Sequence, residues 1–297
     1  TNDINNLEAG KVQYSAFCND SGGVIDDLLV YHLGDYYMLV VNASNIEKNF
    51  EWLSSKLIDD VSLEDQSDTI SLLALQGPLS RVYLKKLYPK IEKLKYYETL
   101  LPDNDKVVVA RTGYSGELGF EIYAPNSIIL KLWNEILSLS DDILPVGLGC
   151  RDSLRLEMGY CLYGNELNEQ TTTIEAGLSW ALDKDRLNDT ALNGNKILSN
   201  QLHNKPSNKK IGLISVNRSM LRDGMILFDN NKNDIGKITS GCFSPNLNKS
   251  IAIGYLNLNF DEEKEIFCEI RNKMELVKKT SLPFVKKNYK KNGSNNE

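Results

Sequence analysis

Histidine and cysteine are scarce in this chain of 297 residues, and neither forms a recognisable metal-binding or nucleophilic motif. The two histidines, His32 and His203, lie far apart in the sequence, which leaves little basis for a histidine metal site or for Ser–His catalysis. The five cysteines include no C-x-x-C pair, and an odd, scattered set of thiols indicates an intracellular protein without a disulfide framework. We therefore expect no metal, and chemistry that relies on carboxylates, tyrosines, arginine or a bound cofactor.

Long apolar runs and an excess of basic residues are also missing. No apolar segment is long enough to cross a bilayer. The 34 basic and 40 acidic residues give a net charge of −6, whereas nucleic-acid-binding proteins usually carry a basic excess. The first ten residues are polar and acidic, unlike a signal or transit peptide. These features predict a cytoplasmic protein with no membrane or nucleic-acid partner; a mitochondrial matrix protein without its presequence is the alternative.

The residue patterns that are present predict a mixture of strands and helices. Alternating and β-branched runs favour strands, and apolar residues at helical spacing favour helices. The strands expected in the first two thirds of the chain are 11–17, 24–31, 36–41, 72–75, 106–111 and 119–123, and the helices begin near 46, 79, 129 and 150.

The composition changes near residue 200, where a polar segment containing Pro206 is followed by short strands separated by turns. Many short strands at close spacing are typical of a small all-β barrel or sandwich. We therefore predict a domain boundary near residue 205, with an α+β region over 1–204 and a β-barrel domain over 205–297. The barrel strands are expected at 211–216, 225–228, 234–239, 251–256 and 265–270.

Asp26 and Asp27 are the first candidates for a functional site. They are adjacent in a predicted strand, so one side chain should face inward and the other should face solvent. A carboxylate turned into an apolar environment needs a partner. On the residues alone, this pattern favours a turn-capping aspartate somewhat over a catalytic one.

The other candidates have ordinary structural interpretations as well. Arg151 opens a predicted helix, where it could form a surface ion pair or hold a ligand carboxylate or carbonyl. Tyrosines such as Tyr114 and Tyr160 could be core aromatics with their hydroxyls at the rim. Glu121 alternates with Phe120 and Ile122, which is compatible with a solvated strand face.

Taken together, several segments of the chain resemble the glycine cleavage T-protein family, in the order in which that family has them. The match runs over nearly the whole chain, and a set of segments in register is far more specific than one segment alone. The segments are GGVIDDLLVY (22–31), VVNASN (40–45), LQGP (75–78), RTGYSGELGFEIY (111–123), LGCRDSLRLE (148–157), YCLYGNEL (160–167) and TSGCFSP (239–245).

The resemblance implies a fold, an activity and partners. The fold would be a folate-binding, multi-domain α+β fold around a central cavity, with two interleaved domains over 1–204 and a C-terminal β-barrel. The enzyme would be an aminomethyltransferase (EC 2.1.2.10) of the glycine cleavage system. It would move the one-carbon unit from the aminomethyl group on the lipoylated H-protein to tetrahydrofolate, with release of ammonia. Tetrahydrofolate would be a co-substrate.

The resemblance also implies roles for individual residues. Asp27 matches an essential aspartate near the reactive nitrogens of the folate, where a fixed carboxylate would stabilise developing positive charge. Glu121 matches a glutamate that accepts two adjacent N–H groups of the pterin. Further ligand-binding positions carried over from the family are Tyr14, Tyr31, Val40, Asn42, Tyr114, Arg151, Tyr160 and Tyr289.

Two departures from the family leave alternatives open. The chain lacks the N-terminal segment of similar proteins, and Cys150 stands where a small residue such as alanine is usual. The alternatives are a related folate-dependent demethylase and an inactive, truncated folate-binding remnant. A non-catalytic folate-binding protein of the iron–sulfur assembly type is disfavoured, because the chain has no Lys-Gly-Cys-Tyr-like stretch.

Overall fold

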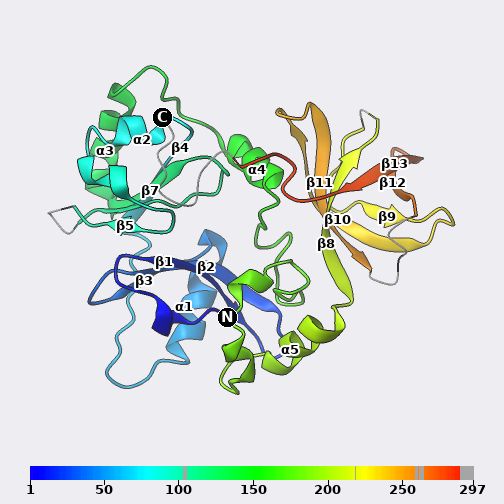
Figure 1. Cartoon of the computed structure of the whole chain (residues 1–297), viewed down its shortest axis with the longest axis horizontal. Helices are drawn as coiled ribbons and strands as arrows, with labels where there is room; N and C mark the ends of the chain where they lie inside the picture. Colours follow the sequence, from blue (N-terminus) through cyan, green and yellow to red (C-terminus); the bar gives the residue numbers. More distant parts are fainter. Residues whose placement is uncertain (103–105, 218, 258–259, 261–263, 288–297) are drawn as a thin grey trace. The chain divides into compact units, whose positions relative to one another are not determined.

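The computed structural model describes residues 1–102, 106–217, 219–257, 260 and 264–287 (Figure 1). The chain forms two compact units, each made of segments distant in sequence. The first unit contains residues 1–3, 14–27 and 149–286, and the second contains 4–13 and 28–148 together with Lys287. The predicted boundary near residue 205, and the interleaving of two domains before it, stay predictions.

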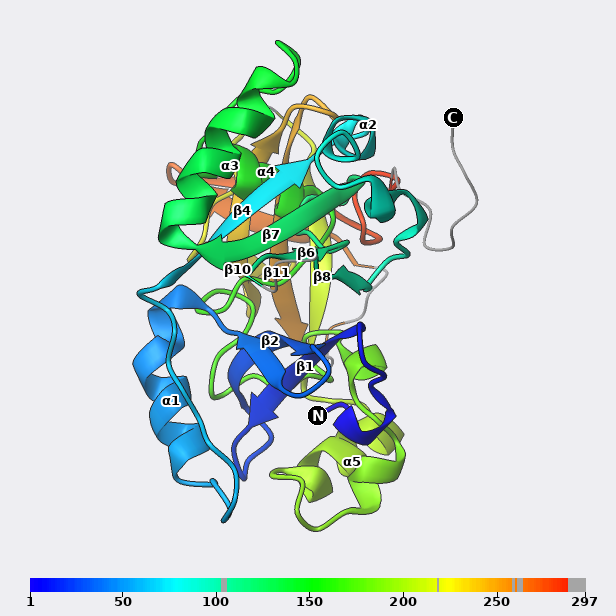
Figure 2. The same cartoon turned by 90° about the vertical axis from the view of Figure 1, so that its left-hand side faces the viewer.

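The second unit is built on a four-stranded antiparallel sheet with the strand order β4-β7-β6-β5. Strands β6 and β7, which lie where strands were expected at 106–111 and 119–123, pair as a hairpin, and helix α3 lies along β4 and β7, as Figure 2 shows. The helix presents Leu132 and Ile136 to the sheet because these residues recur at helical spacing. The element bounds are β4 (Ile70–Gln76), β5 (Thr99–Leu100), β6 (Val108–Ala110), β7 (Gly119–Pro125) and α3 (Asn126–Ser138).

Strand β7 is buried on both of its faces, and each face belongs to a different core. Phe120, Ile122 and Ala124 pack into the cluster that includes α3. Tyr123 lies in a second cluster with Tyr31 and other residues. Because side chains alternate along a strand, Glu121 shares the face of Tyr123. Glu121 is only 6% exposed, so the expected solvated face is not what the structure contains.

A three-stranded sheet with the order β1-β2-β3 has two strands that pass from one unit into the other. A short 3-10 segment, Ala43–Asn45, then leads into helix α1, as the helical spacing after residue 46 predicts. A short helix α2 follows strand β4. The bounds are β1 (Val12–Cys18), β2 (Val24–His32), β3 (Tyr37–Val40), α1 (Ile46–Ser54) and α2 (Ser80–Leu84).

The first unit contains a closed antiparallel barrel with the strand order β10-β11-β8-β13-β12-β9 (Figure 1). Its interior is filled by fully buried side chains such as Leu213, Leu227 and Ile238, so the predicted barrel is confirmed. The bounds are β8 (Asn208–Ser215), β9 (Ile226–Phe228), β10 (Asp234–Ser244), β11 (Lys249–Asn257), β12 (Ile266–Ile270) and β13 (Lys273–Thr280).

Strand β13 was not expected from the sequence. Only Val277 of this strand is buried, and the other residues include three lysines. A strand with one inward apolar residue lacks the alternation that marks a half-buried strand. Its place is fixed instead by pairing with β8 and β12 on either side.

Two further helices complete the first unit: α4 (Leu148–Glu157) and α5 (Asn195–Asn204). The turn between β1 and β2 lies against the segment that precedes α5. Gly22 adopts a φ of +78°, which glycine tolerates readily. Gly23 is needed for a different reason, since a Cβ at this position would stand 1.8 Å from the carbonyl oxygen of Glu169.

We predict that Gly23→Ala lowers the free energy of unfolding by about 1–3 kcal/mol, the usual cost of forcing extra volume into a packed site. The added Cβ would force the backbone of Glu169 to move. The hydrogen bonds from the Asn19 side chain and the Val24 amide to the same segment oppose that movement. Urea denaturation measures the effect. Gly147→Ala is the matched control, since nothing lies within 4 Å of a Cβ there. Equal stability of the two variants would contradict the close approach.

Candidate functional site

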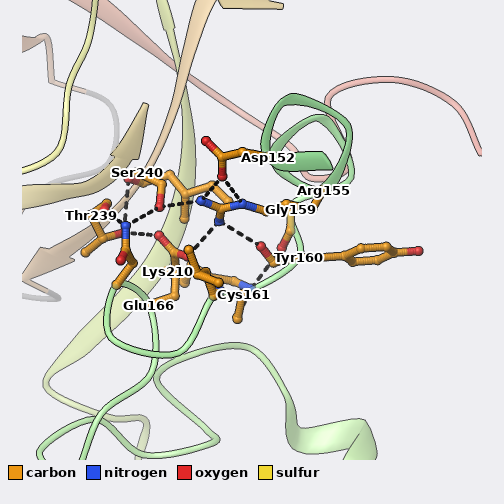
Figure 3. Close-up of polar contacts among 12 residues, drawn as sticks. Asp152, Arg155, Gly159, Tyr160, Cys161, Glu166, Lys210, Thr239 and Ser240 are labelled. Carbon is orange, nitrogen blue, oxygen red and sulfur yellow. Dashed lines mark hydrogen bonds and ion pairs between the residues drawn. The ribbon is translucent and has the colours of Figure 1, made fainter. Parts of the chain in front are cut away.

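A buried ion pair between Arg155 and Glu166 lies at the centre of the first unit's polar contacts (Figure 3). Arg155 is 2% exposed and Glu166 is fully buried. The Nη1 atom of Arg155 donates to Glu166 Oε2 at 2.9 Å and to the carbonyl of Tyr160 at 3.2 Å. Its Nε atom donates to Asp152 at 2.8 Å. A buried guanidinium needs such a set of acceptors to offset the loss of water.

A β-bulge in β10 brings two consecutive residues to the same ion pair. The register with β11 shifts between Ile238 and Ser240, which leaves Thr239 as the extra residue. Neighbouring strand residues normally face opposite sides, and a bulge re-aims them. Thr239 Oγ1 donates to Glu166 Oε1 at 2.5 Å, and Ser240 Oγ accepts from Arg155 Nη2 at 2.9 Å.

Glu157, at the end of α4, is a second buried charge that joins this helix to the barrel segment. It is 1% exposed. Its Oε1 accepts a hydrogen bond from Ser244 at 2.5 Å, and its Oε2 accepts one from the Asn246 side chain at 2.6 Å. The Glu157 carbonyl accepts from the amide of Phe284 at 2.8 Å.

Three of the sequence segments that carry the resemblance therefore meet in one buried network: 148–157, 160–167 and 239–245. The sequence reasoning selected Arg151 in this region and missed Arg155, Glu157 and Glu166. The available signal was a pair of charges interleaved with Leu154 and Leu156 in a helix that must bury one face. This network joins α4, the segment that follows it and strand β10.

Asp26 and Asp27 were expected to place one side chain inward and the other in solvent, and the structure matches this only for Asp26. Asp26 is fully buried, and Asp27 is half-buried rather than solvated. The hydroxyl of Tyr14 donates to Asp27 Oδ2 at 2.9 Å. The Tyr14 ring lies against Trp180, with centroids 5.2 Å apart and planes inclined by 30°. The sequence analysis did not single out Trp180, whose side chain is 64% exposed.

Cys161 and Lys210 lie in the same unit as Asp27. Lys210 Nζ donates to the Cys161 sulfur at 2.9 Å and to the Gly159 carbonyl at 3.2 Å. Burial raises the pKa of the Cys161 thiol, the charges of Glu166 and Asp27 raise it further, and Lys210 offsets part of the effect. The thiol is therefore protonated at neutral pH and is not a nucleophile.

The second unit contains a buried cluster around Glu121. Thr112 Oγ1 donates to Glu121 Oε2 at 2.5 Å, and the Tyr123 hydroxyl donates to the same oxygen at 3.4 Å. The hydroxyl of Tyr31, a fully buried residue, is 2.8 Å from that of Tyr123 and 3.4 Å from Thr112 Oγ1. Burial raises the pKa of both tyrosines, and the charge of Glu121 adds to it. Both hydroxyls therefore remain donors.

The remaining predicted positions are spread over both units. Tyr114 and Tyr160 are half-buried, and Arg151 is exposed on α4. Figure 3 shows the Tyr160 ring pointing away from the polar network to which its carbonyl contributes. Val40 ends β3, and Asn42 precedes the 3-10 segment; both are half-buried. Tyr289 lies outside the described residues.

The structure brings together some of these positions within each unit. Tyr14 contacts Asp27 in the first unit, and Tyr31 is linked to Glu121 through Tyr123 and Thr112 in the second. Over the described residues, no group of three or more histidine, cysteine, aspartate or glutamate side chains is arranged to hold a metal ion. In the same part of the chain, no helix combines the length and apolar character that a membrane span requires.

Comparison with known proteins gives a consistent result. Residues 1–186 match the family model of the GCVT N-terminal domain, and residues 209–286 match that of the glycine cleavage T-protein C-terminal barrel domain. An aminomethyltransferase from Chloroherpeton thalassium is 40% identical over 296 residues, which cover 97% of this chain and 81% of the relative. One from Pseudothermotoga lettingae is 41% identical over 293 residues, covering 96% and 79%.

A solved structure has the same fold. The crystal structure of glycine cleavage system aminomethyltransferase T from Bartonella henselae superposes with a TM-score of 0.88 and 35% sequence identity. The superposition covers 96% of this chain and 78% of that one. The fold and these comparisons thus define an α+β transferase with a C-terminal barrel. The chain belongs to the glycine cleavage T-protein family, and its activity is that of an aminomethyltransferase.

We predict that Glu166→Gln lowers the free energy of unfolding by up to about 3–5 kcal/mol, because Arg155 would lose its buried countercharge and keep only that of Asp152, whose side chain is 50% exposed. The double variant Arg155→Met/Glu166→Met should recover much of this loss, since it removes both charges. Urea denaturation measures both effects. The exposed pair Lys85–Glu92 is the matched control, and Glu92→Gln should cost at most about 1 kcal/mol. Equal losses at the two sites would contradict the role of the buried pair.

Proposed function

We propose that this chain transfers the one-carbon unit of an aminomethyl group from the lipoyl arm of an H-protein to tetrahydrofolate, with release of ammonia. The family and its activity support the reaction class. Tetrahydrofolate and the lipoylated H-protein are the substrate and partner that the family implies, and the site chemistry is consistent with both. The observation that carries the proposal is the buried, hydrogen-bonded carboxylate of Glu121 on β7.

Glu121 is proposed to bind the pterin ring. The amino-pyrimidinone edge of a pterin presents two adjacent N–H donors, and a carboxylate can accept both at once. The residues fit this ligand, because an ionised carboxylate is acceptor-only and the hydroxyls of Thr112 and Tyr123 favour its charged form. Burial strengthens each such hydrogen bond by lowering the local dielectric constant.

Asp27 is proposed to act on the reacting groups electrostatically rather than by proton transfer. Positive charge develops when ammonia leaves the sulfur-bound aminomethyl carbon. A carboxylate that is already oriented stabilises this charge without reorganisation. The hydrogen bond from Tyr14 to Oδ2 supports such an orientation, and the half-buried position leaves Asp27 partly accessible.

The other positions carried over from the family are proposed to line the ligand site. Arg151 is suited to a carboxylate or carbonyl of the ligand, since its planar group can donate two parallel hydrogen bonds. Asn42 is proposed to make a polar contact with the ligand and Val40 an apolar one. Aromatic contacts with the ligand are proposed for Tyr14, Tyr31, Tyr114, Tyr160 and Tyr289.

We predict that Glu121→Gln weakens tetrahydrofolate binding by about 10- to 100-fold, the range expected for loss of hydrogen bonds to a charged group. The amide keeps the size of the side chain but replaces one acceptor oxygen by a donor. Isothermal titration of the purified protein measures the dissociation constant. Glu117→Gln, a change in the same hairpin loop, is the control. Unchanged affinity in the Glu121 variant would overturn the proposed pterin contact.

Replacement of the catalytic carboxylate should have a different signature. We predict that Asp27→Asn lowers turnover by about 10²- to 10³-fold, the range for removing one preorganised electrostatic group, while tetrahydrofolate still binds. Asp20→Asn, in the turn before β2, serves as the control. A turnover assay with aminomethylated H-protein, run beside the folate titration, separates the two effects. Undiminished turnover in the Asp27→Asn variant would contradict the proposed role of Asp27.

A further inference from the structure

The cluster around Glu121 contains three hydroxyl groups, and only that of Tyr31 belongs to a residue proposed above to line the ligand site. Thr112, Tyr123 and Tyr31 come from the loop after β6, from β7 and from β2. All three residues are at most 5% exposed. Residues in a solvated loop or on a solvated strand face would be far more exposed. Polar groups this deeply buried are costly unless each is hydrogen-bonded, so their arrangement is specific.

The hydroxyl groups of this cluster can form one directed chain of hydrogen bonds that ends at Glu121. Each hydroxyl carries one proton, and an ionised carboxylate can only accept. Thr112 and Tyr123 both donate to Glu121 Oε2, so their protons are committed there. When Tyr31 is the donor in its 2.8 Å contact with Tyr123, the Tyr123 proton is left for Glu121. The chain of hydrogen bonds runs from Tyr31 to Tyr123 to Glu121, and Thr112 donates to the same carboxylate.

The distances rank the donors. The Thr112 contact of 2.5 Å lies in the range of charge-assisted O–H···O⁻ hydrogen bonds, whereas the Tyr123 contact of 3.4 Å is long. Of these two donors, Thr112 is the closer to the carboxylate. Tyr123 gives weaker support, and Tyr31 acts through Tyr123.

We propose that Thr112, supported by Tyr123 and Tyr31, is a positioning residue that fixes Glu121 as an oriented acceptor for the amino-pyrimidinone edge of the folate. The proposal rests on the proposed function of Glu121. It adds that the specificity for a ligand with two adjacent N–H donors depends on residues that need not touch the ligand. Tyr31, which is fully buried, is thereby given a role in this supporting network in addition to the ligand contact proposed above.

A carboxylate held at one oxygen by Thr112 cannot rotate without breaking its shortest hydrogen bond. Both pterin donors therefore meet a fixed pair of oxygen atoms. A ligand that lacks the 2-amino group forms one of the two hydrogen bonds at most, so it gains less from this fixed orientation. The contribution of Thr112 should consequently depend on whether the ligand carries the 2-amino group.

The test compares Thr112→Val with Thr112→Ser for two ligands, tetrahydrofolate and its 2-desamino-2-methyl analogue. Titration calorimetry gives the dissociation constants. Thr112→Val should weaken tetrahydrofolate binding about tenfold, the effect of one hydrogen bond to a charged group, and analogue binding less than about threefold. Thr112→Ser keeps the hydroxyl and should retain wild-type affinity. Thr99→Val is the matched control, because its buried hydroxyl has no hydrogen-bond partner among the described residues.

The outcomes are distinguishable from those that test the proposed function. Equal weakening of both ligands by Thr112→Val would indicate a general structural role and would overturn the positioning role. Unchanged affinity for both, with binding lost in Glu121→Gln, would also overturn it while leaving the pterin contact intact. Unchanged tetrahydrofolate affinity in the Glu121→Gln variant would overturn the proposed function itself. If Thr112→Val does not fold, Tyr123→Phe replaces it and should show the same ligand dependence with a smaller effect.

Discussion

The buried ion pair between Arg155 and Glu166 holds together segments that are distant in the sequence. Arg155 comes from α4, Glu166 from the loop that follows it, and the two are joined by Thr239 and Ser240 of the barrel. Such a pair adds little net stability compared with apolar residues of the same volume, but each member makes the other indispensable. The first unit therefore has one arrangement of these segments in which no charge is left without a partner.

Glu121, in the second unit, is also a buried carboxylate whose position is restricted by its neighbours. Glu121 lies between two apolar cores and is held by hydroxyl groups rather than by bulk water. A carboxylate in this environment cannot adapt to many ligands, because every new orientation would break a short hydrogen bond. Asp27 is held more loosely, by Tyr14 in a half-buried position, which is consistent with an electrostatic role rather than a recognition role.

The sequence predicted those parts of the fold whose residues show a regular pattern. The hairpin of β6 and β7, helix α3 and the barrel follow from alternation, helical spacing and turn residues. Strand β13 was missed because only Val277 faces the barrel interior, and its position depends on pairing with strands elsewhere in the chain.

The candidate site was predictable only in part. Asp27 and Glu121 could be selected through the resemblance to a family, while the residues alone allowed a turn cap and a solvated face. The partners of these carboxylates could not be predicted, because no sequence pattern shows which hydroxyls face them. Thr112 reaches Glu121 across the hairpin, and Tyr31 reaches Tyr123 and Thr112 through the tertiary fold. The bulge that directs Thr239 and Ser240 to one ion pair likewise has no sequence signal, since it reverses the alternation on which strand prediction depends.

The central claim is that this chain is an aminomethyltransferase that uses tetrahydrofolate as the acceptor. The most direct measurement is a product analysis with H-protein whose aminomethyl carbon is isotopically labelled. The account predicts labelled methylenetetrahydrofolate, ammonia and dihydrolipoyl H-protein in equal amounts, and only when tetrahydrofolate is present. Absence of labelled product from a folded, folate-binding chain, or one-carbon transfer only from a methylated sulfonium or amine, would contradict it.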